Sequence, residues 1–272
     1  WGVAARAGAR YRLRLDARRD ARMADGLIVA WRAADGRELA STHLTGLTSA
    51  GKRFDVEMMP TADDVGASLV LTFEGPGTAW LDCVSLVPVE TWRKHRFGLR
   101  NDLGTLVEGL RPSFVRFPGG CFVEGGDSLK DAFRWPRTLG DPASRPGHMN
   151  ANWGYWSSDG LGFHEYLQWC EDLGAEPLLV VNCGMSHKES VPIDQLGEWV
   201  QEALDAIEYA NGPSTSRWGR VRAENGHPAS FGLKYIEIGN ENGMFGGFGG
   251  SRAEYTERYR IFHEAIKARA PE

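Results

Sequence analysis

Over residues 1–92, apolar side chains tend to recur at every second position. From Tyr11 to Ala17 they alternate with charged residues, which predicts a strand with one buried and one solvent-facing side. Turn signals such as Asp35-Gly36 separate this strand from later ones. The further predicted strands are Leu27 to Trp31, the run after Gly36, Phe54 to Met58, Leu69 to Phe73, and Thr78 to Leu86. Several short alternating strands of this kind predict a β-sandwich.

From residue 93 onward the pattern changes to helical spacing interrupted by short apolar runs. A linker at 88–97 separates the two regimes. The expected helical faces run from Leu99 to Leu110, Phe163 to Leu173, Leu196 to Ile207 and Tyr255 to Ile266, with the apolar runs Ser113 to Phe117, Pro177 to Val181 and Leu233 to Ile238 between them. This alternation predicts βαβ units around a parallel sheet. A Rossmann sheet is the competing fold, but no G-x-G-x-x-G follows a predicted strand.

Residues suited to chemistry follow directly after the three predicted strands of this second region. They are Pro118 to Phe122, Asn182 to Gly184, and Asn240-Glu241. Active sites of (β/α)8 barrels lie at that end of the strands, and three strand-plus-helix units make an incomplete barrel. The expected organisation is therefore a sandwich over 1–92 and a partial barrel over 93–272.

Glu241 is the leading candidate for acid–base chemistry. A carboxylate at the end of a buried strand can protonate a glycosidic oxygen, and the neighbouring amide of Asn240 can bond a sugar hydroxyl. Taken alone, an Asn-Glu pair is common, and capping of the next helix or pairing with an arginine is the favoured explanation of Glu241. Strand alternation would send Asn240 and Glu241 to opposite faces, unless the strand ends or bulges at Gly239. Glu237 is expected to form an ion pair, with Arg116 as the candidate partner.

Composition and charge exclude some classes of partner. The 272 residues are 42% hydrophobic and 25% charged, as in ordinary folded domains. The net charge of -5 is spread along the chain, which argues against nucleic acid as a partner. No apolar stretch is long enough to span a bilayer, so no membrane partner is expected. Trp31 and Trp80 are expected in the core of the sandwich rather than as sugar-binding platforms.

Neither cysteine nor histidine spacing predicts a metal site. Cys83, Cys121, Cys170 and Cys183 lie far apart, which favours free and mostly buried thiols. His148 and His164 are isolated from other ligand types along the sequence. We therefore expect no metal and no cofactor.

Four segments resemble glycoside hydrolase family 51 α-L-arabinofuranosidases, and they occur in the expected order. They are PSFVRFPGGCFVEGG at 112–126, GHMNANWGYWSSDGLGFHEYLQWCEDL ending at Leu173, IEYANG at 207–212, and IEIGNEN at 236–242. The stretch from Leu69 to Trp92 is similar to the carbohydrate-binding-like sandwich inserted in the plant-type branch of that family.

The resemblance implies specific roles. It makes Glu241 the catalytic acid/base and Asn240 a sugar-bonding amide. Arg116 would support the nucleophile, although a barrel-interior ion pair is its simpler role. The other expected substrate-binding residues are the backbone turn Gly120-Cys121, the aromatic wall Trp153 and the strand-end residue Asn182. The thiol of Cys121 is equally well explained as inert and buried.

The resemblance also implies that the chain is a fragment holding barrel strands two to four. The family's nucleophile is a glutamate at the end of the seventh strand, so the nucleophile is expected outside this chain. A missing N-terminus would remove any export signal; the compartment stays open, with a secreted or periplasmic location favoured over a cytoplasmic one. The segment 243–250 is richer in glycine than the family pattern. This difference predicts that the part of the site that holds the leaving group (the aglycone) differs from that of the family.

The resulting functional prediction is a retaining hydrolase that releases terminal α-L-arabinofuranosyl residues. Its partners would be arabinan- or arabinoxylan-type polysaccharides or oligosaccharides. A homo-oligomer is also an open expectation, because family members are often oligomeric. One alternative is another clan A glycosidase, an endoglucanase or a xylosidase. The other is an inactive truncated fragment that only binds carbohydrate.

Overall fold

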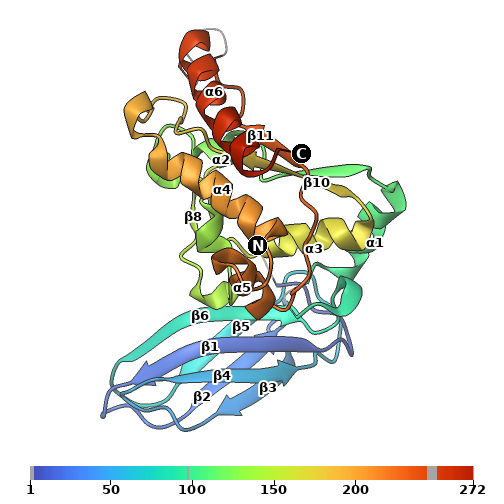
Figure 1. Ribbon diagram of the computed structural model, residues 1–272. Helices are drawn as coiled ribbons and strands as arrows, with labels where there is room; N and C mark the ends of the chain where they lie inside the picture. The colour runs from blue at the N-terminus through green and yellow to red at the C-terminus, as the bar shows by residue number, and fades with distance from the viewer. Residues whose placement is uncertain (1–2, 97, 244–249, 272) are drawn as a thin grey trace. The chain divides into compact units, whose positions relative to one another are not determined.

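The computed structural model describes residues 3–96, 98–243 and 250–271 (Figure 1). It has two compact units, 1–105 and 106–272. The division falls within helix α1 (Asn101–Leu110), some residues after the boundary predicted from the linker. Most of the glycine-rich segment, 244–249, lies outside the described residues. None of the described helices is long and apolar enough to cross a membrane.

The first unit contains two antiparallel sheets of three strands each, in the orders β4-β1-β6 and β3-β2-β5. The strands are β1 (Tyr11–Arg19), β2 (Leu27–Arg32), β3 (Glu38–Leu44), β4 (Lys52–Met58), β5 (Ser68–Phe73) and β6 (Ala79–Pro88). Each segment with a predicted period of two is a strand. A short 3-10 turn, η1 (Trp92–Lys94), follows β6.

Residues from both sheets form one apolar core. Leu13 and Leu15 of β1 and Val29 and Trp31 of β2 are almost fully buried in it. The rings of Trp31 and Tyr11 lie nearly perpendicular to each other, with their centroids 4.7 Å apart. Along the strands of both sheets, residues that face this core alternate with residues that face away from it. This alternation explains the period of two in the sequence.

Two side chains of this unit depart from expectation. Trp80 is 44% exposed, and the guanidinium of Arg18 lies 4.5 Å from its ring centroid, so it is not a core residue. Arg14, predicted on the solvent-facing side of β1, is buried, and its Nε lies 3.7 Å from Asp55 Oδ2. A long arginine stem can lie along apolar surface while its head reaches a carboxylate, which alternation alone does not reveal.

The second unit is built on a parallel sheet of β7 (Phe114–Phe117), β10 (Glu176–Val181) and β11 (Tyr235–Ile238), in the order β11-β10-β7. Leu179 pairs with Phe117, and Val181 pairs with Ile238. The carboxyl ends of the three strands therefore lie at one edge of the sheet.

The remaining elements of this unit are α2 (Cys121–Glu124), α3 (Phe163–Leu173), α4 (Gly197–Asn211), α5 (Arg217–Glu224), α6 (Arg252–Arg269), the hairpin β8 (His148–Asn150) and β9 (Tyr155–Ser157), and the 3-10 turns η2 (Leu129–Asp131), η3 (Trp135–Thr138), η4 (Pro142–Ser144) and η5 (Ile193–Gln195). Local sequence sets the ends of several helices. Gly174 ends α3 in the left-handed conformation, and Ser251 caps α6 by accepting the backbone N–H of Glu254 at 3.1 Å.

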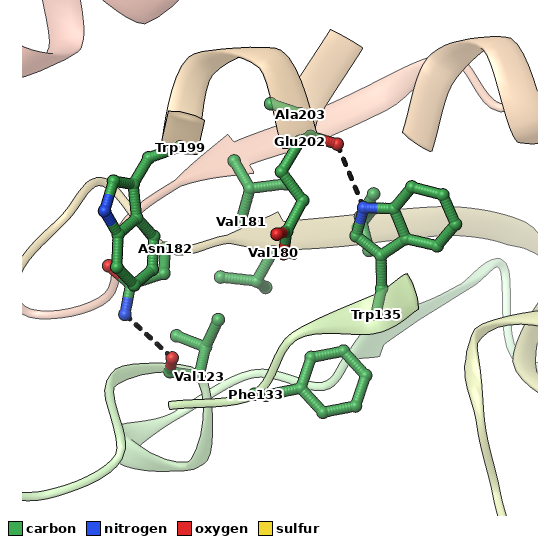
Figure 2. A pocket seen from close by; sticks show the side chains of 10 residues that line it. Val123, Phe133, Trp135, Val180, Val181, Asn182, Trp199, Glu202 and Ala203 are labelled. Carbon is green, nitrogen blue, oxygen red and sulfur yellow. Dashed lines mark hydrogen bonds between the residues drawn. The ribbon is translucent and has the colours of Figure 1, made fainter. Parts of the chain in front are cut away.

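Helix α4 packs over β10 around a small cavity (Figure 2). Trp135 closes one side, and its indole N–H donates to the carbonyl of Glu202 at 2.9 Å. The partly buried carboxylate of Glu202 accepts a hydrogen bond from Arg134 at 2.7 Å, yet loss of solvent around it raises its pKa.

Helix α1 was predicted correctly, but the leucines of its predicted apolar face, such as Leu106 and Leu110, are exposed. The described residues do not cover this face.

Replacing Trp31 by alanine should destabilise the protein by about 3–5 kcal/mol, because it leaves a large cavity between the two sheets. Replacing Trp80 should change stability by about 1 kcal/mol or less, because an exposed cation–π contact contributes little. Urea unfolding of both variants followed by circular dichroism would test this. Equal losses for the two tryptophans would contradict the assigned core.

Candidate active site

Three strand ends bring most of the predicted site residues to one place. Strand β11 ends at Ile238, and Gly239 follows with φ 77°. Glu241 also has a positive φ, 52°, which is uncommon for a residue with a side chain. The strand has thus ended before Asn240 and Glu241, so strict alternation no longer separates them, as the sequence argument required.

Arg116 of β7 joins two residues of the β11 segment. Its Nε and Nη2 donate to the two carboxylate oxygens of Glu237 at 2.6 and 2.5 Å. Nη2 also donates to Asn240 Oδ1 at 2.8 Å. The pKa of Arg116 is raised, chiefly by the hydrogen bond to Glu237. The predicted ion pair is confirmed, although about a third of each side chain remains exposed.

A glycine is required beside this arginine. A Cβ on Gly119 would lie 2.7 Å from Arg116 Nη1, and the backbone there has φ 65°. The Pro-Gly-Gly sequence after β7 therefore gives the guanidinium room to reach Glu237 and Asn240.

Glu124 is a site residue that the sequence analysis missed. It is only 1% exposed, at the end of the short helix α2. Its carboxylate accepts hydrogen bonds from Asn240 Nδ2 at 3.2 Å and Asn242 Nδ2 at 3.0 Å. His187 Nε2 lies 3.3 Å from the same carboxylate. Burial raises the pKa of Glu124 to about 7. The hydrogen bonds from Asn240 and Asn242 lower this pKa, whereas the negative charge of Glu241 raises it further.

Asn242 completes the support of the segment that carries Glu241. Its Oδ1 accepts the backbone N–H of Asn240 at 2.9 Å and faces the thiol of Cys183 at 3.4 Å. Glu241 is thereby flanked by two asparagines whose side chains are both bonded to Glu124. The Glu241 side chain itself is exposed.

Cys121 and Gly120 lie on the β7 side of Glu241. The thiol of Cys121 is partly exposed and lies 4.0 Å from Glu241 Oε2. Burial, with the charges of Glu124 and Glu241, raises its pKa, so this thiol is not an activated nucleophile. Gly120 precedes α2 with φ 61°, and its Cα faces open space.

Trp153 lines an open hollow beside this turn. The indole is 61% exposed. The hollow is formed by Phe117, Pro118, Gly119, Phe122, Asn150, Trp153 and Tyr155. Asn152 Nδ2 donates to the carbonyl of Cys121 at 3.2 Å, which ties the tryptophan loop to the site.

Asn182 differs from the other predicted residues. Its side chain is buried, and Oδ1 accepts the backbone N–H groups of Gly184 and Met185 at 2.7 and 2.9 Å. Its Nδ2 donates to the carbonyl of Val123 (Figure 2). The described contacts make Asn182 part of the frame beneath the site, and none of them links it to Glu241.

Histidines take two different roles. His148 bonds Asp159 at 3.1 Å and His164 bonds the hydroxyl of Tyr209 at 2.8 Å, both within the fold. Among the described residues, however, Cys121, Glu124 and His187 bring donor atoms within 4.8 Å of one another. Spacing along the sequence could not reveal this group, because His187 lies on the loop after β10.

Comparison with known proteins identifies the family to which the chain is similar. The family model of the alpha-L-arabinofuranosidase 1 domain matches residues 106–272. Alpha-L-arabinofuranosidase 1 of Arabidopsis thaliana is 40% identical over 276 residues, which cover all of this chain and 39% of that protein. An extracellular exo-alpha-L-arabinofuranosidase of Streptomyces chartreusis is 41% identical over 71% of the chain and 24% of its own length.

Solved structures give the same result. The arabinose-bound α-L-arabinofuranosidase MgGH51 covers the whole chain with a TM-score of 0.89 at 34% identity, and the chain covers 44% of it. An arabinose complex of the Thermotoga maritima enzyme covers 65% of the chain with a TM-score of 0.53 at 26% identity, and 33% of that enzyme is matched.

These matches place the chain among the glycoside hydrolases. It belongs to the family 51 α-L-arabinofuranosidases, and it spans about two fifths of the length of its Arabidopsis relatives.

Gly239→Ala should destabilise the protein by about 2–4 kcal/mol. The new Cβ would lie 2.1 Å from Asn242 Oδ1, in a backbone conformation that already disfavours alanine. Gly140→Ala is the matched control, because Gly140 has a similar φ of 74° and open space around it. Urea unfolding of both variants separates the clash from the backbone strain. Similar losses for the two would show that Asn242 can move away freely.

Proposed function

We propose that the protein containing this chain is a retaining glycosidase that releases terminal α-L-arabinofuranosyl residues from arabinan- or arabinoxylan-type substrates. The observation that carries the proposal is the exposed carboxylate of Glu241 between two asparagines, Asn240 and Asn242, whose amides are bonded to Glu124. The names of the relatives support the substrate class, and MgGH51 supports the monosaccharide through its bound arabinose.

In the proposed reaction Glu241 acts twice. It first protonates the departing glycosidic oxygen while a second glutamate, outside this chain, attacks the anomeric carbon. It then takes a proton from the water that releases arabinose. The two carboxylates would lie roughly 5–5.5 Å apart, the separation typical of retaining enzymes. An exposed position at the end of β11 gives Glu241 access to both the leaving group and the water.

Asn240 is proposed to bind a sugar hydroxyl. Its Oδ1 is occupied by Arg116, and one N–H of its amide points to Glu124. An amide nitrogen carries two donors, so the second N–H can bond a hydroxyl without breaking either contact. Gly120-Cys121 would contact the furanose through the backbone, and Trp153 would form the wall of the hollow beside it.

We also propose that residues 93–272 supply strands two to four of a (β/α)8 barrel and that residues 1–92 form a carbohydrate-binding-like sandwich. The parallel order of β7, β10 and β11, with chemistry at their carboxyl ends, supports the barrel. Phe114 and Tyr235 on the two outer strands are more than half exposed, as expected for strands that, among the described residues, pair on one side only.

Glu241→Ala should lower turnover of 4-nitrophenyl α-L-arabinofuranoside, because the variant loses general acid–base catalysis. The expected loss is on the order of 10²- to 10⁴-fold, with rescue by added azide. Glu257→Ala, which removes an exposed carboxylate on α6, is the control and should retain full activity. The assay uses the complete protein encoded by the gene. Turnover of a glucan or xyloside in place of the arabinoside would overturn the substrate assignment.

Arg116→Lys should lower kcat on the same arabinoside by roughly 10- to 100-fold. A lysine ammonium cannot reproduce the fork that holds Glu237 and Asn240 together. Arg260→Lys is matched to it, since Arg260 also bridges two carboxylates but on the exposed surface of α6. Unchanged kcat in the Arg116 variant would exclude a positioning role for the guanidinium.

A further inference from the structure

Three donor groups of types that bind zinc meet beside Glu241. The Sγ of Cys121, a carboxylate oxygen of Glu124 and a ring nitrogen of His187 all lie within 4.8 Å of one another. Glu124 is buried, and the His187 side chain is about one-tenth exposed. Thiolate, imidazole and carboxylate together favour Zn²⁺ and similar transition metals over Mg²⁺ or Ca²⁺.

We propose that Cys121, Glu124 and His187 form an inhibitory binding site for Zn²⁺ or a closely related divalent transition metal. The proposal departs from the expectation of no metal, which rested on spacing along the sequence. It does not assign the metal a part in glycoside hydrolysis. The consequence for activity rests on the proposed function, whereas the binding itself does not.

Charge and geometry both favour occupation. Binding releases the thiol proton of Cys121 to solvent, and the thiolate with the Glu124 carboxylate neutralises the two charges of the ion. With these two ligands the ion is neutral in the buried part of the site, and the exposed carboxylate of Glu241 would add one negative charge on its solvent-facing side. Tetrahedral zinc with these ligands needs donor atoms about 3.3–3.7 Å apart. His187 Nε2 and Glu124 Oε2 already meet this spacing at 3.3 Å, and the Sγ of Cys121, within 4.8 Å of the other two donors, is the atom that would have to come closer.

The residues around the three donor groups also favour a metal site. Asn240 and Asn242 already orient the Glu124 carboxylate, as outer hydrogen bonds commonly orient metal ligands. Glu241 Oε2 lies 4.0 Å from Cys121 Sγ, which places it within reach of a fourth coordination position. An ion bound there would hold the proposed acid/base as a ligand and withdraw it from proton transfer. Zinc should therefore inhibit hydrolysis.

Titration of the complete, metal-free protein with Co²⁺ alone tests the site directly. A thiolate-to-cobalt charge-transfer band should appear at one equivalent and disappear when Zn²⁺ is added. Cys121→Ser should abolish the band, and His187→Gln should raise the Co²⁺ concentration needed for half-saturation at least tenfold. Cys83→Ser is the matched control and should bind like the wild type, because Cys83 is also a partly exposed cysteine outside any disulfide but lies on β6. Near-UV circular dichroism checks that each variant is folded.

Inhibition is measured in parallel on 4-nitrophenyl α-L-arabinofuranoside. Zn²⁺ at micromolar concentration should suppress turnover, EDTA should restore it, and His187→Gln should shift the half-inhibitory concentration at least tenfold. No charge-transfer band with Co²⁺ up to 1 mM, or a band that Cys121→Ser retains, overturns the site. Full activity at saturating Zn²⁺ overturns its inhibitory role. Absence of arabinoside turnover in metal-free protein contradicts the proposed function instead, and the cobalt titration then still decides the metal site.

Discussion

The amide of Asn240 is held at both ends by side chains from the β7 segment. Arg116 donates to its oxygen, and Glu124 accepts from its nitrogen. These bonds tie the end of β11 to the end of β7, strands that are separated in the sheet by β10. The orientation of the Asn240 amide is fixed by the guanidinium, which can only donate, so the amide oxygen faces Arg116 and the amide nitrogen faces Glu124. The position of the neighbouring Glu241 depends on this link.

Three carboxylates close to this link have distinct environments. Glu237 is neutralised by a bidentate arginine, Glu124 is buried among amide donors with its pKa raised to about 7, and Glu241 is exposed. Similar side chains within one site can thus serve as a structural anion, a buried acceptor and a group open to solvent. Environment, rather than residue type, assigns these functions.

Local patterns predicted much of the fold. Alternation gave the strands around Leu13 and Trp31, and the Ser251 cap and Gly174 stop were correct. Strand ends and family resemblance together located Arg116, Asn240 and Glu241. Glu124 and His187 were not identified from the sequence, because they come close to each other only when the loops after different strands fold together. The burial of Arg14 and the exposure of Trp80 depend on tertiary neighbours, which periodicity does not encode.

The left-handed backbone at Glu241 has a consequence for the history of such chains. A non-glycine residue in this region costs roughly 1–2 kcal/mol, so selection for stability alone favours glycine or asparagine at this position. Only a requirement for the carboxylate opposes that pressure. A homologue that has lost its need for hydrolysis is therefore expected to replace this glutamate early and to gain thermal tolerance as it does so. A glutamate in this strained conformation is what the proposed acid/base role would require.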